Sequence, residues 1–225
     1  MADNHAAARP HSRTGLSRLL LSHQIPFKQN ALLQSILFGF IVYWICMAIH
    51  PKDWKDWAVE NTLLVLYMIV MAFTYRIFPH SNLAYILIAI FLAMHAYAAH
   101  FTYQHTPIDD WMKHAFHIKR GFYDRVVHFA YGLMISFSVR ESVLYFLKLQ
   151  FVKNYFVTFM IIVASSGIYE MLEAWSALIF NSKLAAQFVG LEGDPFDSQK
   201  DMTSALAGVL IAIGIFWIMH SRRRT

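Results

Sequence analysis

A long stretch without charge constrains this chain more than any other feature. No Asp, Glu, Lys or Arg lies between Lys28 and Lys52. A helix of that length is enough to cross the roughly 30 Å hydrocarbon core of a bilayer. Similar apolar runs recur, and 57% of the 225 residues are hydrophobic. The sequence therefore predicts an all-α, polytopic helical membrane bundle.

The apolar runs and their charged borders predict six membrane-spanning helices. They cover about 31–49, 61–78, 83–101, 125–147, 154–180 and 202–220. His50 and Pro51 end the first, and Pro79 separates the second from the third. We expect two regions: a basic, flexible cytoplasmic tail over residues 1–30 and a transmembrane domain over residues 31–225.

Charge at the span ends predicts the orientation. With both termini inside, 11 of the 19 Lys and Arg residues are cytoplasmic, including the run Arg222 to Arg224. This distribution, rather than the net charge of +5, excludes nucleic acid as a partner. No small-residue cleavage site follows the first span, which favours a retained signal anchor. We expect a multi-pass membrane protein, with membrane lipids as partners. The sequence leaves its oligomeric state open.

Acidic residues are distributed unevenly across the predicted membrane. In this topology only Asp3 and Glu141 of the 14 Asp and Glu residues fall on the inner side. Acidic residues contribute little to orientation. Ionisable residues inside spans are costly and point to function. The pattern therefore predicts a polar site at the outer face.

The fourth and fifth predicted spans supply the clearest candidates. Asp124, His128 and Tyr131 recur at i, i+4 and i+7 along one helical stripe. A helix cap with an interfacial His and Tyr is the alternative interpretation. Glu170 and Glu173 share a face deep in an apolar run, and two such carboxylates require a metal or an Arg or His partner.

Two further segments add polar residues to the same predicted layer. His95, His100 and Tyr103 end the third span, but the two histidines are too far apart around the helix to bind one ion squarely. Asp197 and Asp201 precede the sixth span, after Asp194. Capping by Asp197 and a first-turn position for Asp201 are the alternative interpretation of this pair.

From about His50 onwards the sequence resembles the YjdF-like family of bacterial inner-membrane proteins, a family of unknown function. The segments that carry the resemblance are DWAVENTLLVL (56–66), HFTY (100–103), DRVVHFAYGL (124–133), YEMLEAW (169–175) and GDPFDSQKDM (193–202). They cover roughly three-quarters of the chain in order, and imply a multi-pass inner-membrane protein.

A more distant similarity is to VanZ-like membrane proteins, which are associated with glycopeptide-antibiotic resistance. The matching positions are Asp124, His128, Glu170, Asp201 and Gly208. The chain departs from that pattern in having Arg125 for Lys, Glu173 for Gln and Ala205 for Asn. Glu173 favours a cation site, while Ala205 argues against a direct transfer of role.

These observations predict a membrane-embedded site that binds a divalent metal. The candidate ligands are His95, His100, Asp124, His128, Glu170, Glu173, Asp197 and Asp201. Mixed imidazole and carboxylate ligands favour zinc, manganese or iron. Such a metal can activate water against an ester or phosphoester of a lipid or lipid-linked envelope substrate.

Within this hypothesis the residues take separate roles. Asp124, His128 and Glu173 are the catalytic candidates. Tyr103, Arg125 and Tyr131 are the substrate-binding candidates, with Arg125 paired to a phosphate or to Glu170.

Three other interpretations stay open. The first is a lipid-binding, transport or VanZ-like resistance protein without catalysis. The second is a haem protein that uses two of His95, His100 and His128 as axial ligands. The third is a scaffold whose polar helix ends only form hydrogen bonds.

Overall fold

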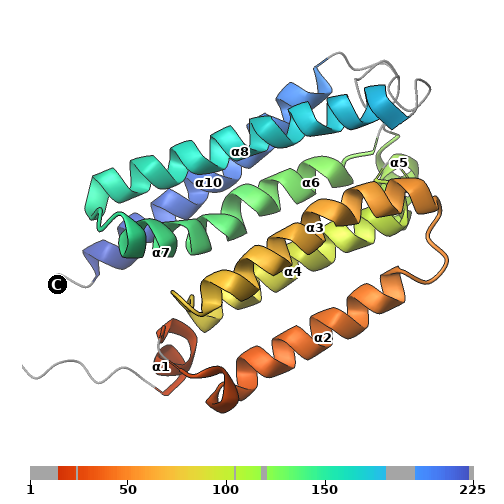
Figure 1. Ribbon diagram of the computed structural model, residues 1–225. Helices are drawn as coiled ribbons and strands as arrows, with labels where there is room; N and C mark the ends of the chain where they lie inside the picture. The colour runs from red at the N-terminus through yellow and green to blue at the C-terminus, as the bar shows by residue number, and fades with distance from the viewer. Residues whose placement is uncertain (1–14, 24, 104, 118–120, 181–195, 223–225) are drawn as a thin grey trace, which may run out of the picture.

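The computed structural model describes residues 15–23, 25–103, 105–117, 121–180 and 196–222, and all regular structure in these ranges is helical. The helices pack side by side in one bundle (Figure 1). In chain order they are α1 (Gly15–Leu21), the 3-10 helix η1 (Phe27–Gln29), α2 (Ala31–Met47), α3 (Trp54–Tyr75), α4 (Asn82–His100), α5 (Pro107–Phe116), α6 (Tyr123–Ala130), the π-helix η2 (Tyr131–Ile135), α7 (Ser136–Phe146), α8 (Phe151–Phe180) and α10 (Asp197–Ser221). The predicted all-α architecture is confirmed. Residues 1–14 of the predicted tail lie outside the described residues.

Among the described residues, four stretches are long and apolar enough to cross a membrane: Trp54–Tyr75, Asn82–Phe101, Phe151–Ser176 and Asp197–Ser221. Helix α2 is apolar but shorter, with 17 residues. The fourth predicted span corresponds to α6, η2 and α7, which follow one another without a break. Large apolar side chains such as Phe38, Phe73 and Ile179 are exposed on the outside of the bundle. The fold is a multi-pass membrane bundle, while the total of six spans and the inside position of the termini stay predictions.

Helices α3 and α10 begin well before their predicted starts at 61 and 202. Helix α3 starts at Trp54 because the Asp53 side chain accepts hydrogen bonds from the backbone N–H groups of Lys55 and Asp56. Glu60 therefore lies inside the helix rather than ahead of it. Helix α10 starts at Asp197, and Phe196 occupies the N-cap position without a side-chain hydrogen bond. The expected N-cap role of Asp197 is wrong.

The predicted loop 102–124 contains a helix, α5. The Thr106 side chain caps it by accepting from the backbone N–H of Asp109, and Pro107 occupies its first turn, where no N–H is needed. Its outer face exposes Trp111 and Phe116. An amphipathic helix with exposed aromatic residues at a span end is typical of the membrane–water interface.

Asp109 links α5 to the start of α6. Its side chain is buried, and Oδ1 accepts hydrogen bonds from the backbone N–H groups of Phe122 (2.5 Å) and Tyr123 (2.9 Å). These groups belong to the first turn of α6, where backbone donors have no partner within the helix. Asp109 therefore fixes the direction in which α6 begins and the position of the polar residues that follow.

Helix α10 crosses α6 and η2 at two glycines. A Cβ atom added at Gly132 would overlap the Ala205 carbonyl oxygen, and one added at Gly208 would overlap the Phe129 carbonyl oxygen. Only glycine permits backbones to approach so closely. The crossing joins the start of α6 to the start of α10, the two segments that carry most of the predicted acidic residues.

Candidate functional site

Polar side chains from five helices meet at one end of the bundle, which we call the site end. They come from the start of α3, the end of α4, the start of α6, the second half of α8 and the start of α10. These segments were predicted to share one layer, and the helix packing in Figure 1 brings them together.

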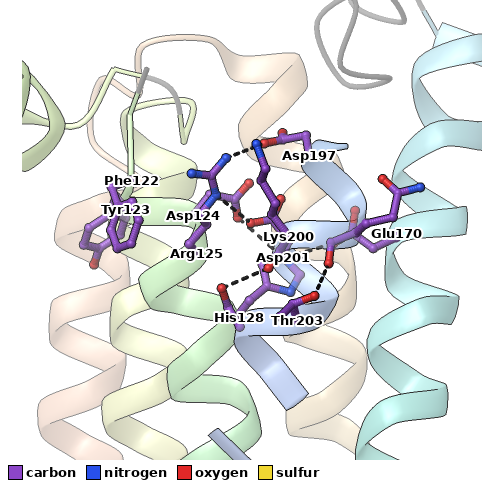
Figure 2. A network of polar contacts seen from close by, with 12 residues as sticks. Phe122, Tyr123, Asp124, Arg125, His128, Glu170, Asp197, Lys200, Asp201 and Thr203 are labelled. Atoms are coloured by element: carbon purple, nitrogen blue, oxygen red, sulfur yellow. Dashed lines mark hydrogen bonds and ion pairs between the residues drawn. The ribbon is translucent and has the colours of Figure 1, made fainter. Parts of the chain in front are cut away.

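Three aspartates form the first group of the site, the Asp cluster: Asp124 of α6 and Asp197 and Asp201 of α10. One carboxylate oxygen of each lies within 4.8 Å of the other two. Asp201 is 2% exposed, and its Oδ1 has no hydrogen-bond partner among the described residues. Figure 2 shows these carboxylates facing one another across the α6–α10 interface. The cluster therefore presents several oxygens to one small volume.

Arg125 partly balances this negative charge. Its Nη2 atom lies 3.3 Å from Asp197 Oδ1, and its Nε atom lies 3.9 Å from Asp201 Oδ1. The guanidinium also lies over the Phe122 ring, 5.7 Å from the ring centroid. The sequence predicts that Arg125 pairs with a phosphate or with Glu170; the ion pairs found among the described residues are with Asp197 and Asp201, which the early start of α10 brings to the guanidinium.

His128 connects the Asp cluster to α8. Its Nε2 atom lies 3.5 Å from Asp124 Oδ1 and 3.2 Å from Glu170 Oε1. The imidazole is buried and packs edge-on against Tyr169, with 5.7 Å between ring centroids. A buried imidazole held between two carboxylates can accept or release a proton at a fixed position.

A second group of polar residues, the Glu60 group, lies on the other side of His128. The Tyr169 hydroxyl donates to Glu60 Oε2 at 3.1 Å. His95 Nε2 lies 3.1 Å from the Glu60 carbonyl oxygen and 3.9 Å from its carboxylate. Glu173, which is half-buried, lies close enough to Glu60 and to the Tyr169 hydroxyl to interact with both. Tyr103 completes the group.

Tyr103 reaches this group through an unusual turn. Thr102 and Tyr103 both have positive φ, and the Tyr103 backbone N–H bonds to the Ala98 carbonyl oxygen at 2.8 Å. Burial, followed by the charges of Glu60 and Asp124, holds the pKa of Tyr103 well above its ordinary value. The phenol therefore stays protonated and donates to His95 Nδ1 at 2.5 Å. His95 then carries its own proton on Nε2, which faces Glu60.

An apolar cavity of about 370 Å³ runs from this polar end towards the middle of the bundle. Its walls come from α3, α4, α6, η2 and α8. At the site end four rings line it, and we call these rings the collar: His95, Tyr103, His128 and Tyr169. Three of the collar side chains, His95, His128 and Tyr169, contact the carboxylates described above. The cavity therefore ends at rings whose other side meets the acidic groups.

The structure separates the two histidines of α4. His95 lies in the Glu60 group, whereas His100 Nδ1 lies 2.9 Å from the Met47 carbonyl oxygen and its ring packs on Phe101. His100 is therefore not brought to the other candidate ligands. Tyr131 lines the cavity and hydrogen-bonds to Ser165, away from the carboxylates. Asp194 lies outside the described residues.

Two residues of the site are not among the predicted ligands or catalytic residues. Glu60 is expected to open the second span in the same outer layer, and the early start of α3 is what buries it. Tyr169 precedes Glu170 in an apolar run, where an aromatic residue is most often core packing. The i, i+4 spacing of Tyr169 and Glu173 places the two on one helix face and was the available signal.

Comparison with known proteins agrees with this architecture. Residues 32–222 match the family described as predicted membrane protein (DUF2238). The inner membrane protein YjdF of Escherichia coli (strain K12) is 28% identical over 180 residues, which is 80% of this chain and 86% of that protein. No solved structure matches the chain. Together with the four apolar helices, these matches place the chain in the inner membrane as a multi-pass protein. The chain belongs to the DUF2238 family of membrane proteins.

Proposed function

We propose that the site end binds a divalent cation and uses it to hydrolyse or modify an ester or phosphoester of a membrane lipid or lipid-linked envelope substrate. Asp124, Asp197 and Asp201 bind the cation. Two observations on Asp201 support this most strongly. Its buried Oδ1 atom has no hydrogen-bond partner among the described residues, and one of its carboxylate oxygens lies within 4.8 Å of an oxygen of Asp124 and of Asp197.

The donor atoms favour a particular class of metal. Three carboxylate oxygens with an imidazole nearby suit manganese, and also iron or zinc, better than a soft metal. Arg125 shares the same carboxylates, so it acts as a resident cation when metal is scarce. A bound metal lowers the pKa of its water and creates a nucleophile near neutral pH.

His128 is positioned to assist that water. It lies beside Asp124 and is oriented by Glu170 on its other side, as a general base requires. Arg125 faces the same volume and is able to contact a phosphate oxygen. The cavity beyond the collar gives the apolar part of a lipid a place beside the reacting group.

Metal binding is the first test. Isothermal titration of detergent-purified protein with Mn²⁺ should give one site per chain, and Asp201→Asn should weaken it at least tenfold, as loss of a ligand or its support does. Asp110→Asn is the matched control, because Asp110 is exposed and its recorded ion pair is to Lys113. Equal binding by both variants would refute the assignment. A Mn²⁺-dependent change in phospholipids, followed by mass spectrometry and absent in Asp201→Asn, tests the reaction.

A second function, lipid binding without catalysis, is favoured by the cavity itself. It would include a VanZ-like role in envelope resistance. Under this alternative, lipid copurifies with the protein and Asp201→Asn leaves both lipid content and lipid chemistry unchanged. The two functions are therefore separated by the same pair of variants.

A further inference from the structure

The apolar cavity opens sideways, between α3 and α8. Leu66 and Val70 of α3 line it and are exposed, and so are Ile168 and Leu172 of α8. All four belong to segments long and apolar enough to span the membrane. The opening therefore faces the hydrocarbon of the bilayer, and we call the cavity with this opening the lateral crevice.

The size and lining of the crevice match a hydrocarbon chain. At roughly 30 Å³ for each small group, the volume that one water takes in the liquid, a cavity of about 370 Å³ holds on the order of ten chain carbons. Apart from Ser165 and Ser166, the lining is aliphatic and aromatic until the collar is reached. Ser166 also lines it, is 2% exposed, and its hydroxyl has no hydrogen-bond partner in the described part of the chain. A lipid ester oxygen is an acceptor that this hydroxyl can use.

Charges at the site end select the head group. At the Asp cluster, the proposed cation and Arg125 are the positively charged groups that a phosphate can contact. Glu60 and Glu173 are carboxyl groups that can ionise beside a bound ammonium group, and among the described residues neither forms an ion pair with Lys or Arg. His128 and Tyr169 connect the two groups. A positive and a negative subsite next to each other are complementary to a zwitterion.

We propose that the lateral crevice binds one acyl chain of an aminophospholipid, with its phosphate at the Asp cluster and its ammonium group at Glu60 and Glu173. The assignment of the phosphate rests on the proposed function, whereas the binding of the chain does not. The chain enters from the bilayer between α3 and α8, and the head group stays at the site end beyond the collar.

Photo-crosslinking in phosphatidylcholine vesicles tests the crevice. The probe is phosphatidylethanolamine with a diazirine near the end of one acyl chain, and labelled peptides are located by mass spectrometry. The wild type should be labelled on the α3 and α8 walls. Ile168→Trp fills the opening and should lower this labelling at least fivefold. Ile161→Trp is the matched control, because Ile161 is exposed on the same face of α8 two turns away but does not line the crevice. Equal labelling of the two variants overturns the proposal.

A second comparison tests the ammonium subsite. The same diazirine chain on phosphatidylglycerol, which has no amine, should label the crevice about tenfold less, as one charge-assisted interaction predicts. Glu60→Gln should remove this preference while keeping chain labelling. Equal labelling by both lipids in the wild type overturns the ammonium subsite. All measurements are repeated with EDTA. Crevice labelling that persists without metal supports the acyl-chain site even if the Mn²⁺ titration refutes the proposed metal function. Labelling that is lost with EDTA contradicts the claim that the acyl chain binds independently of the metal.

Discussion

Replacing Gly208 by alanine tests the helix crossing on which the Asp cluster depends. A Cβ atom at this position would overlap the Phe129 carbonyl oxygen and lie 2.7 Å from the Leu133 backbone nitrogen. These are backbone atoms of α6 and η2, so no side-chain rotation relieves the overlap. Helix α10 must move away from α6, and Asp201 moves away from Asp124 with it.

The size of the effect follows from two opposing contributions. Overpacking a well-packed contact costs about 1–3 kcal/mol. Alanine regains up to about 1 kcal/mol of intrinsic helix preference over glycine. Because the overlap is with backbone atoms, the upper part of that range, about 2–3 kcal/mol, applies. The net loss is therefore about 1–2 kcal/mol, which corresponds to roughly 2–8 °C in Tm for a chain of this size. Because the carboxylates separate, Mn²⁺ binding should weaken as well.

Thermal unfolding in detergent, followed by tryptophan fluorescence, measures this loss. Gly214→Ala is the control on the same helix, since a Cβ there meets nothing within 4 Å. We expect Gly214→Ala to be as stable as the wild type or slightly more stable. If Gly208→Ala has the same Tm and the same Mn²⁺ affinity as Gly214→Ala, the argument for a glycine-dependent crossing is refuted.

Three further predictions address other parts of the fold. Asp109→Ala leaves the first N–H groups of α6 without their acceptor and should lower the free energy of unfolding by about 2 kcal/mol, measured by thermal unfolding. Replacing the exposed Asp110 by alanine should change stability by less than about 0.5 kcal/mol. Equal losses in the two variants would contradict the capping role of Asp109. Burial, with a smaller contribution from His23, lowers the pKa of His80 from 6.5 to about 4, so the folded state prefers the neutral imidazole. Protonation of His80 therefore leaves stability unaffected above about pH 6.5 and lowers it as the pH falls towards 4, by about 2 kcal/mol at pH 5. His80→Gln should lose this part of the acid sensitivity, so its Tm should fall less than that of the wild type between pH 7 and pH 5. The same fall in Tm in both proteins would refute the role of His80. Arg125→Gln removes the guanidinium from Asp197 and Asp201 and should destabilise the metal-free protein by about 2–3 kcal/mol. Added Mn²⁺ should restore most of the lost Tm, and no rescue by Mn²⁺ argues against a shared cation site.

The helices were predictable because hydropathy and turn residues act locally. Long charge-free runs have few alternatives to a spanning helix, and Pro51 and Pro79 mark the breaks. Helix starts were less predictable. The Asp53 cap extends α3 into a charged segment that hydropathy assigns to the loop, and the same applies to the polar first turn of α10. Helix α5 was missed because it is short and amphipathic rather than apolar.

The candidate site could be predicted as a layer but not as a set of contacts. Helical periodicity placed Asp124 and His128 on one face, and the structure puts His128 within 3.5 Å of Asp124. Pairing between helices depends on their rotation and separation, which single-helix patterns do not contain. The pairing of Arg125 with Asp197 and Asp201, and of Tyr169 with Glu60, could therefore be found only from the packed bundle.

The metal site is the central claim, and anomalous X-ray scattering from crystals soaked in Mn²⁺ tests it most directly. We predict one strong anomalous peak between the carboxylates of Asp124, Asp197 and Asp201, close to the Nε2 atom of His128. The same peak should be absent from Asp201→Asn crystals soaked in parallel. An ordered site end with no peak at these carboxylates, or a peak that remains in Asp201→Asn, would contradict the account.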